Sequence, residues 1–294
     1  MKYNNNLSLF LFYCIFISQI FSQNIFHVDI KGTIDMGLPY YIKRSIEVAE
    51  KDSNNIIVFE VDTFGGRVDA ATQIKDAILA TKLKTIAFIN RRAISAGALI
   101  SLSCDKIYMT NGATIGAATA VDLNGNKASE KVISYMREEM ASTAQAHNRS
   151  REIAEAMVDE QLEIDFFITS SGDTLTSKEV KGFLKNKLIT LSTKEALSIG
   201  MIDGIVSDWD SLLLKLENNK NNLIKIDQNW SEALVRFLTN PVFAPILMSL
   251  GMFGLIFEVK SPGFGVPGIA GLFCLSLFFG AHLLVGLANQ MELI

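Results

Sequence analysis

The stretch IIVFEVDTFGGRVDAATQIKDAILATKLKTIAFI, residues 56–89, decides the fold that this sequence predicts. It begins with an apolar β-rich run, passes through the pair Gly65-Gly66 and continues with a helical pattern at residues 68–80. A second apolar run at residues 85–89 completes the unit. Strands that are apolar on both faces and alternate with amphipathic helices are typical of a parallel sheet covered by helices. The stretch therefore predicts an α/β domain.

The same alternation continues on both sides of this stretch. Further strands are predicted from short β-rich runs, at residues 25–30, 106–109 and, as the last strand, 202–206. Further helices are predicted from amphipathic patterns, at residues 40–50, 95–102, 129–146, 151–158 and 208–217. Residues 162–190 indicate short strands and turns. Ser192 followed three positions later by Glu195 is a capping-box pattern, which predicts the start of one more helix.

The first 22 residues (1–22) have the features of a secretory signal peptide. Lys2 precedes an apolar run at residues 7–17, and Ser22 is a small residue at the expected cleavage position. The alternative is an uncleaved N-terminal anchor, because Ile20 is bulky close to that position. The α/β domain, assigned to residues 23–217, is therefore predicted to be exported to the outer, extracytoplasmic side of the membrane.

Two apolar segments near the C-terminus predict a membrane region, residues 241–294. Glu258 is the single charge in residues 241–259, and residues 268–288 contain no Asp, Glu, Lys or Arg. These lengths suit two transmembrane helices. The alternative, a buried hairpin of a soluble protein, needs more surrounding protein than this chain supplies. Between the two regions, residues 218–240 are interpreted as a linker followed by an amphipathic interfacial segment.

Composition excludes two other kinds of protein. The formal net charge of −4 and the pI of about 5.5 disfavour a general nucleic-acid binder, which would show a basic patch or stripe. Signal cleavage would remove Cys14, and the remaining Cys104 and Cys274 cannot build a disulfide framework. The domain must therefore be held together by burial of its apolar core.

Ser95 is the candidate nucleophile. It lies in the run Ala93-Ile94-Ser95-Ala96-Gly97-Ala98, at the start of a predicted helix, where the simplest interpretation is an N-cap serine. Its small neighbours would let a substrate approach closely, and a helix start favours a developing negative charge. The pair Gly65-Gly66 follows the adjacent strand, where open α/β sheets bind ligands, and its amides could face a substrate carbonyl.

A nucleophilic serine needs a base, and the three histidines are poorly placed to supply one. His27 lies in the first predicted strand and His282 in the second membrane segment. His147, in a polar turn after a long helix, is the one histidine that a Ser-His-Asp triad could recruit, and we regard this as the less favoured alternative.

Lys131 is the favoured base. It lies in the first turn of the helix predicted behind Ser129, at the edge of an expected apolar stripe (Val132, Tyr135, Met136 and Met140). A lysine acts as a base near neutral pH only if its pKa falls by about 3 units from about 10.4. Partial burial and the positive end of a helix both favour such a fall. The competing interpretation is an ordinary solvated lysine.

Several motifs in combination resemble the NfeD family, membrane-bound serine proteases of the ClpP class. They are residues 62–66 (DTFGG), 95–101 (SAGALIS), 105–109 (DKIYM), 115–117 (IGA), 131–135 (KVISY) with Arg149, 191–206 (LSTKEALSIGMIDGIV) and 261–268 (SPGFGVPG). The sequence departs from many relatives at Phe64, where they have proline. Longer members continue into further membrane spans and an OB-type β-barrel, so a sequence that ends at Ile294 is interpreted as a short form or an incomplete product.

The resemblance implies a ClpP/crotonase-like fold with a mostly parallel sheet, followed by transmembrane helices, and a catalytic dyad of Ser95 and Lys131. It implies an oxyanion hole formed by the backbone N–H groups of Gly66 and Ala96, with Gly65 and Gly97 beside the substrate. No metal, cofactor or ATPase is implied. Stomatin-like membrane proteins, cleaved in an apolar segment, are the implied partners, and a homo-oligomer of two or more chains is expected.

Two other functions remain open at this point. Crotonase-like acyl-CoA chemistry would use the same paired amides, but a signal peptide disfavours it because CoA substrates are cytosolic. A non-catalytic membrane scaffold that binds stomatin-like partners would have no need of Ser95 and Lys131, and both residues are present.

Overall fold

A computed structural model describes residues 23–122, 125–169, 172–216, 222–240, 242–260 and 265–285. The predicted signal peptide, residues 1–22, lies outside the described residues. So do residues 218–221 of the predicted linker and residues 261–264 of the last family motif.

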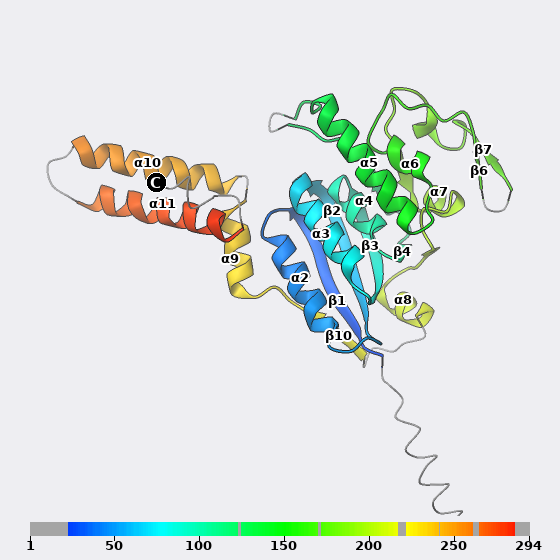
Figure 1. Ribbon diagram of the computed structural model, residues 1–294, viewed down its shortest axis with the longest axis horizontal. Helices are drawn as coiled ribbons and strands as arrows, with labels where there is room; N and C mark the ends of the chain where they lie inside the picture. The colour runs from blue at the N-terminus through cyan, green and yellow to red at the C-terminus, as the bar shows by residue number, and fades with distance from the viewer. Residues whose placement is uncertain are drawn as a thin grey trace, which may run out of the picture.

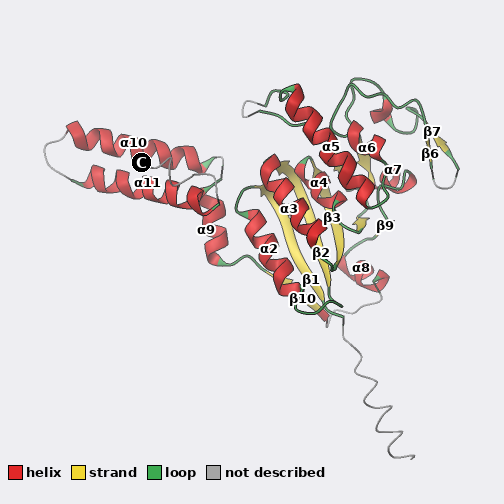
Figure 2. Cartoon of the chain, viewed as in Figure 1, coloured by secondary structure: helices red, strands yellow, loops and turns green. Residues whose placement is uncertain are grey.

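A mostly parallel sheet forms the centre of the α/β domain (Figure 2). Its strands run in the spatial order β10 (Leu223–Ile226), β1 (Ile25–Ile34), β2 (Ile56–Gly66), β3 (Lys84–Ile94), β4 (Lys106–Met109) and β9 (Gly204–Ile205), and all five neighbouring pairs are parallel. The short strand β5 (Thr114–Gly116) pairs in parallel with the C-terminal end of β3. On its other side it pairs antiparallel with β8 (Thr190–Ser192). The predicted α/β class with a mostly parallel sheet is confirmed.

Burial on both faces explains why the strands are continuously apolar. Ile57 and Phe59 of β2 pack into one core with the helices α2 (Leu38–Ala49), α3 (Val68–Ala80) and α4 (Ala96–Leu102). Ile56 and Val58, which point to the other face, pack into a second core with α8 (Trp209–Lys215). Successive side chains of a strand alternate between faces, so a strand covered on both sides needs apolar residues at every position.

The structure extends two strands beyond their predicted ends. β2 continues to Gly66 and β3 to Ile94, so the glycine pair is part of a strand end and not a separate turn before α3. The backbone there is held by pairing, with Thr33 opposite Gly65 and Ile34 opposite Gly66. Strand pairing is a tertiary interaction, and a local apolar pattern does not record it.

A second group of elements covers one end of the sheet (Figure 1). It comprises α5 (Glu130–Ala146), α6 (Arg151–Ala156), β6 (Phe167–Ile168), β7 (Thr174–Leu175), the 3₁₀ turn Lys181–Phe183 and α7 (Thr193–Ser198). Buried Arg149, between α5 and α6, donates to the carbonyl oxygens of Leu102, Cys104 and Asp105 at the end of α4. The predicted capping box is confirmed at α7, where Ser192 and Glu195 satisfy each other's backbone N–H groups.

The strand β10 was not predicted from the sequence, which placed the last strand at residues 202–206. The strand predicted at residues 202–206 is present as β9, and residues 223–226 add a further parallel strand, along β1 at the edge of the sheet. Such a short strand with exposed Ile224 and Lys225 has no local pattern that separates it from a loop.

After β10 the chain forms α9 (Trp230–Leu238) and a hairpin of two long apolar helices, α10 (Phe243–Lys260) and α11 (Val266–Leu284) (Figure 1). Both are long and apolar enough to cross a membrane. Glycines let the two backbones approach, since a Cβ atom at Gly254 would lie 2.7 Å from the Cα of Gly271. Glu258 accepts hydrogen bonds from the N–H groups of Gly265 and Gly268, at 2.6 and 2.9 Å, and so joins α10 to the start of α11.

Candidate active site

Ser95 occupies a strained position between β3 and α4. Its backbone has φ 56° and ψ −117°, a region that residues with a side chain rarely adopt, at a cost on the order of 1–3 kcal/mol. The strained turn is held from both sides, because Ser95 N donates to the carbonyl oxygen of Gly116 at 2.9 Å and Ser95 O accepts from Ala98 N at 2.9 Å. Strain that the surrounding structure maintains is characteristic of functional sites.

The side chain of Ser95 does not act as a helix cap. Ser95 stands at the N-cap position of α4, yet its hydroxyl makes no capping hydrogen bond, unlike Ser150 at the start of α6, which accepts from Ile153 N. The simplest sequence interpretation, a capping serine, is therefore wrong. The half-buried hydroxyl is left for another role.

Glycine residues on both sides bring the backbone close to Ser95. A Cβ atom at Gly65, which has φ +113°, would lie 2.7 Å from Ser95 Cβ and 3.1 Å from its Oγ. A Cβ atom at Gly97 would lie 2.5 Å from the methyl carbon of Thr63. Close packing thus requires glycine at both positions, with Gly65 against Ser95 and Gly97 against Thr63. The predicted place of both glycines beside the substrate stays a prediction.

Thr63 was not identified from the sequence, although it organises this loop. Its hydroxyl donates to the carbonyl oxygen of Gly32 at 2.5 Å and accepts from the N–H of Gly65 at 2.9 Å. Thr63 is buried, and it links the ends of β1 and β2. Its position two residues before a glycine pair was the only local signal, and it did not distinguish Thr63 from an ordinary strand threonine.

The two predicted oxyanion donors are compatible with this geometry. The N–H of Gly65 is taken by Thr63, and Arg67 N donates to Ile34 O at 2.8 Å. Successive N–H groups of a strand point in opposite directions, so the N–H of Gly66 is expected to point away from β1, toward the side of β3 and Ser95. Ala96 is the first residue of α4, where the N–H has no partner within the helix. The role of this pair stays a prediction.

Lys131 lies in the first turn of α5, as predicted, and its side chain is exposed. Among the residues that the structure describes, no hydrogen bond joins its amine to Ser95 Oγ. Ser129 occupies the N-cap position of α5, and its side chain makes no capping hydrogen bond there. Catalytic hydrogen bonds often form only when substrate is bound, so the dyad stays a prediction.

The apolar stripe predicted for α5 is partly wrong. Met136 and Met140 are buried together with Ile133, whereas Val132 and Tyr135 are exposed. Tyr135 faces an open groove of about 600 Å³ between α3 and α5, which is lined by Arg67, Val68, Asp69, Thr72, Gln73 and Tyr135. One end of the groove is bordered by Arg67, which directly follows Gly66 in the chain.

Two further hollows, of about 440 and 360 Å³, open at the carboxyl ends of β1, β2 and β3. Phe64, Arg91 and Arg92 border both of them. The guanidinium of Arg92 lies 4.3 Å from the centre of the Phe64 ring, and its Nε is 3.2 Å from Asp62 Oδ1. Phe64, where relatives often carry proline, is thus an exposed aromatic wall between the two hollows.

The structure removes the alternative that His147 serves Ser95. His147 Nε2 lies 3.0 Å from the carbonyl oxygen of Ser103, and its Nδ1 lies 3.6 Å from Asp105 Oδ1. Ser103 follows the C-terminal end of α4, whereas Ser95 precedes its N-terminal end. His282, in α11, contacts the carbonyl oxygen of Phe278 within its own helix.

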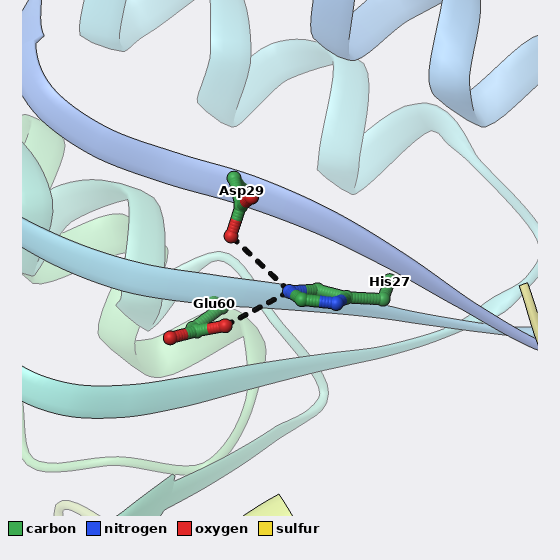
Figure 3. Close-up of side chains that lie close together, drawn as sticks. All are labelled: His27, Asp29 and Glu60. Carbon is green, nitrogen blue, oxygen red and sulfur yellow. Dashed lines mark ion pairs between the residues drawn. The ribbon is translucent and has the colours of Figure 1, made fainter. Parts of the chain in front are cut away.

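His27 belongs to a separate buried cluster, which the sequence did not reveal (Figure 3). Its Nε2 lies 3.2 Å from Asp29 Oδ1 and 2.9 Å from Glu60 Oε2. Burial favours the neutral imidazole, but the hydrogen bonds with Asp29 and Glu60 outweigh it and raise the pKa of His27. Burial likewise opposes ionisation of Glu60, yet hydrogen bonds from His27, Lys31, Asn90 and Trp209 lower its pKa to about 2.

The same three side chains resemble a metal site, because their ligand atoms lie within 4.8 Å of one another. The neighbouring charges disfavour that interpretation. Lys31 Nζ lies 2.7 Å from Asp29 Oδ1 and 2.9 Å from Glu60 Oε1, and Lys225 Nζ lies 3.2 Å from Asp29 Oδ2. Two ammonium groups already occupy the positions around these carboxylates, so we interpret the cluster as an ion-pair network that joins β10, β1 and β2.

Comparison with known families matches nearly all of the described chain. A model described as the N-terminal domain of NfeD1b matches residues 24–226, and one described as the NfeD integral membrane domain matches residues 242–294. The membrane protein NfeD1b of Bacillus subtilis is 35% identical over 91% of this chain, and the membrane-bound protease PH1510 of Pyrococcus horikoshii is 29% identical over 86%. The chain spans 58% and 57% of the lengths of these two relatives.

Solved structures share the fold of the α/β domain. The 1510-N membrane protease specific for a stomatin homolog from Pyrococcus horikoshii is 25% identical and matches 74% of this chain and all of its own, with a TM-score of 0.51. A mutant of the 1510-N membrane-bound stomatin-specific protease in complex with a substrate peptide matches 74% of this chain and 99% of its own, at 24% identity and a TM-score of 0.58.

Proposed function

Because the chain belongs to the NfeD family of membrane proteins, we propose that it is a membrane-anchored serine endopeptidase with Ser95 as nucleophile and Lys131 as base. The observation that carries the proposal is the strained backbone of Ser95 combined with a hydroxyl that caps no helix. The relative named as a membrane-bound protease supports the same class of reaction.

The proposed reaction proceeds through an acyl-enzyme. The Lys131 amine accepts the proton of Ser95 Oγ as the oxygen attacks the scissile carbonyl carbon, and the N–H groups of Gly66 and Ala96 stabilise the resulting oxyanion. The Lys131 ammonium then gives its proton to the leaving amine as the peptide bond breaks. A water molecule, deprotonated by Lys131, releases the acyl group and restores Ser95.

Substrate binding would also create the environment that Lys131 needs. In the single chain its amine is exposed, next to the exposed side chains of Val132 and Tyr135 on the same helix. A peptide in the groove between α3 and α5, or a second copy of the chain, would cover this surface. Removal of water disfavours the charged ammonium. It therefore lowers the pKa of a lysine toward neutral pH, where the uncharged amine can act as a base.

Apolar segments of membrane-associated proteins, stomatin-like proteins among them, are the proposed substrates. The support is the exposed aromatic ring of Phe64 next to Gly65, that of Tyr135 in the groove between α3 and α5, and the relative named as specific for a stomatin homolog. We propose that the protease domain lies on the extracytoplasmic side, that the chain forms homo-oligomers and that the reaction needs no ATP.

Labelling with a fluorophosphonate probe and cleavage of apolar peptides test the proposal. The variants are Ser95→Ala, Lys131→Ala and Lys131→Arg, with Ser134→Ala and Lys194→Ala as matched controls on exposed positions. We expect labelling to disappear in Ser95→Ala, cleavage to fall at least 10³-fold in all three variants, on the order of the losses seen for catalytic triads, and both controls to behave as wild type. Undiminished cleavage in Ser95→Ala or Lys131→Arg would refute the dyad.

One observation favours a non-catalytic membrane scaffold, namely the exposure of Lys131 without a hydrogen bond to Ser95. Complementation of cells that lack the gene distinguishes the protease function from the scaffold function. If Ser95→Ala restores the normal phenotype as well as wild type does, the scaffold function is correct and the protease function is wrong.

A further inference from the structure

The helix α9 has an apolar face that the described chain leaves largely exposed. Trp230, Leu234 and Phe237 follow one another at helical spacing and are 80%, 44% and 50% exposed. Their spacing places all three side chains on one side of the helix. A row of three large apolar side chains on one face of a helix is the kind of surface that marks an interaction site.

The opposite face of α9 is fixed to the α/β domain. Arg44 of α2 donates to both carboxylate oxygens of Glu232, at 2.6 and 2.8 Å. Arg236 donates to Asp35 Oδ2 at 2.8 Å and to the carbonyl oxygen of Thr33 at 3.0 Å, and Asp35 is buried. These contacts fix the rotation of α9 about its axis, so the apolar face cannot turn inward.

The position of α9 indicates what covers this face. Only residues 239–242 separate α9 from α10, the rings of Phe237 and Phe243 lie 4.4 Å apart, and α9 contacts both α10 and α11. Figure 1 shows α9 running across the end of the hairpin at which α10 begins and α11 ends. If α10 and α11 span a bilayer, α9 lies along the surface of that bilayer.

We infer that α9 is an interfacial helix that inserts Trp230, Leu234 and Phe237 into the boundary between lipid headgroups and acyl chains, and thereby holds the α/β domain against the membrane. Tryptophan prefers this boundary, and an amphipathic helix buries its apolar face there to a depth of roughly 5–10 Å. The inference does not depend on the proposed protease chemistry.

The charges of α9 specify the kind of lipid contact. Both ionisable side chains of the helix, Glu232 and Arg236, are engaged with the domain. The face presented to the membrane therefore carries no charge, and its insertion is driven by apolar burial. We expect binding that depends neither on anionic lipids nor on ionic strength, unlike that of helices with lysine-rich or arginine-rich polar faces.

Tryptophan fluorescence of the full chain in phosphatidylcholine vesicles tests the inference, because the chain has two tryptophans, Trp209 and Trp230. Trp209 lies on the far side of the sheet, 4.2 Å from the His27 ring. Trp209→Phe leaves Trp230 as the reporter, and Trp230→Phe is the matched control. The quencher is phosphatidylcholine brominated either near the headgroup or deep in the acyl chain.

We expect Trp230 to emit at blue-shifted wavelengths and to be quenched at least twofold more by shallow than by deep bromine, with no change between 50 and 500 mM salt. Trp209 should be quenched by neither lipid. If Trp209→Phe fails to fold, the difference between wild type and Trp230→Phe gives the same measurement. Unquenched emission from Trp230 would overturn the inference. A blue shift that disappears when the protein is diluted in lipid would also overturn it, because such a shift indicates that a second copy of the chain covers Trp230.

Discussion

Gly65 lies so close to Ser95 that a Cβ atom at Gly65 would be 2.7 Å from Ser95 Cβ. Gly65 lies at the end of β2 and Ser95 directly follows the neighbouring strand β3, and each has a backbone conformation with positive φ. The strained turn at Ser95 therefore fits only because its neighbour has no side chain. This relationship makes the position of the candidate nucleophile sensitive to changes that leave the nucleophile itself intact.

Gly65→Ala should abolish most activity while Ser95 remains in place. The new methyl group would push Ser95 away from the cleft, and a displacement of about 1 Å at a reacting group can cost 10²-fold in rate. We expect cleavage to fall at least 10²-fold in steady-state assays with an apolar peptide.

Gly200→Ala is the matched control, because Gly200 also has positive φ (+73°) but a Cβ there would meet no atom within 4 Å. The Gly200→Ala variant should have the same backbone cost of a side chain at positive φ as Gly65→Ala, and it should keep full activity. Equal activity in the two variants would show that the contact between Gly65 and Ser95 is unimportant.

Thr63→Val should lower activity and keep the fold. Valine has nearly the shape of threonine and preserves the packing on Gly97, but it cannot hydrogen bond to Gly32 and Gly65. An unsatisfied buried polar group costs about 1–3 kcal/mol, and here the cost falls on the loop before Gly66. We expect kcat to drop about 10-fold to 10²-fold with a smaller change in KM.

Thr143→Val provides the comparison, since Thr143 is buried in α5 and its hydroxyl bonds only to Glu139 O in the described structure. That variant should change thermal stability and leave kcat at the wild-type value. A similar loss of kcat in both variants would point to a general weakening of the domain.

The His27 cluster should give the α/β domain its greatest stability in mildly acidic solution. The pKa of Glu60 is lowered from 4.5 to about 2, so its contribution is complete above 4.5 and is lost as the pH falls toward 2. The pKa of His27 is raised above 6.5, so its contribution is complete below 6.5 and is lost as the pH rises through the higher, folded-state value. Both contributions are complete between about pH 4.5 and 6.5.

Glu60→Gln should remove most of this dependence, because it leaves His27 beside Asp29 alone and the ammonium of Lys31 with one carboxylate fewer. We expect a loss on the order of 3 kcal/mol near pH 5.5, in the range for broken buried ion pairs. Thermal melting from pH 3 to 8 measures it, with Glu163→Gln at an exposed position as control. A wild-type melting temperature that does not vary over this range would contradict the prediction.

Gly254→Leu should weaken the membrane hairpin. A Cβ at Gly254 would lie 2.6 Å from the carbonyl oxygen of Pro267 and 2.7 Å from Gly271 Cα, so α10 and α11 would have to separate. Gly280→Leu is the control, because a Cβ at Gly280 meets no atom within 4 Å. We expect the melting temperature in detergent micelles to fall by several degrees in the first variant alone, and an equal fall in both would refute this packing.

Local chemistry made several elements predictable. The bounds of α3 agree with the sequence pattern, because an amphipathic helix repeats its apolar side chains every three or four residues whatever surrounds it. The capping box of Ser192 and Glu195 is likewise a contact between residues three apart. The two apolar helices follow from the length and apolar composition of their segments alone.

Other features depend on contacts that no local pattern records. The edge strand β10 exists because Leu223–Ile226 pairs with β1, nearly 200 positions earlier in the chain. The side of α5 that is buried depends on what packs against it, which is why Ile133 is inside and Tyr135 outside. The cluster of His27, Asp29 and Glu60 needs two neighbouring strands in register.

The candidate site divides in the same way. The sequence by itself determined that a serine with small neighbours follows one strand of a parallel sheet and that a glycine pair follows a neighbouring strand, because residue type and order are local properties. Only the tertiary structure decided that Ser95 is strained and caps no helix, that Gly65 touches it and that Thr63 holds the loop. The physical reason is that φ, close approach and hydrogen bonding between strand ends depend on the register in which separate segments pair.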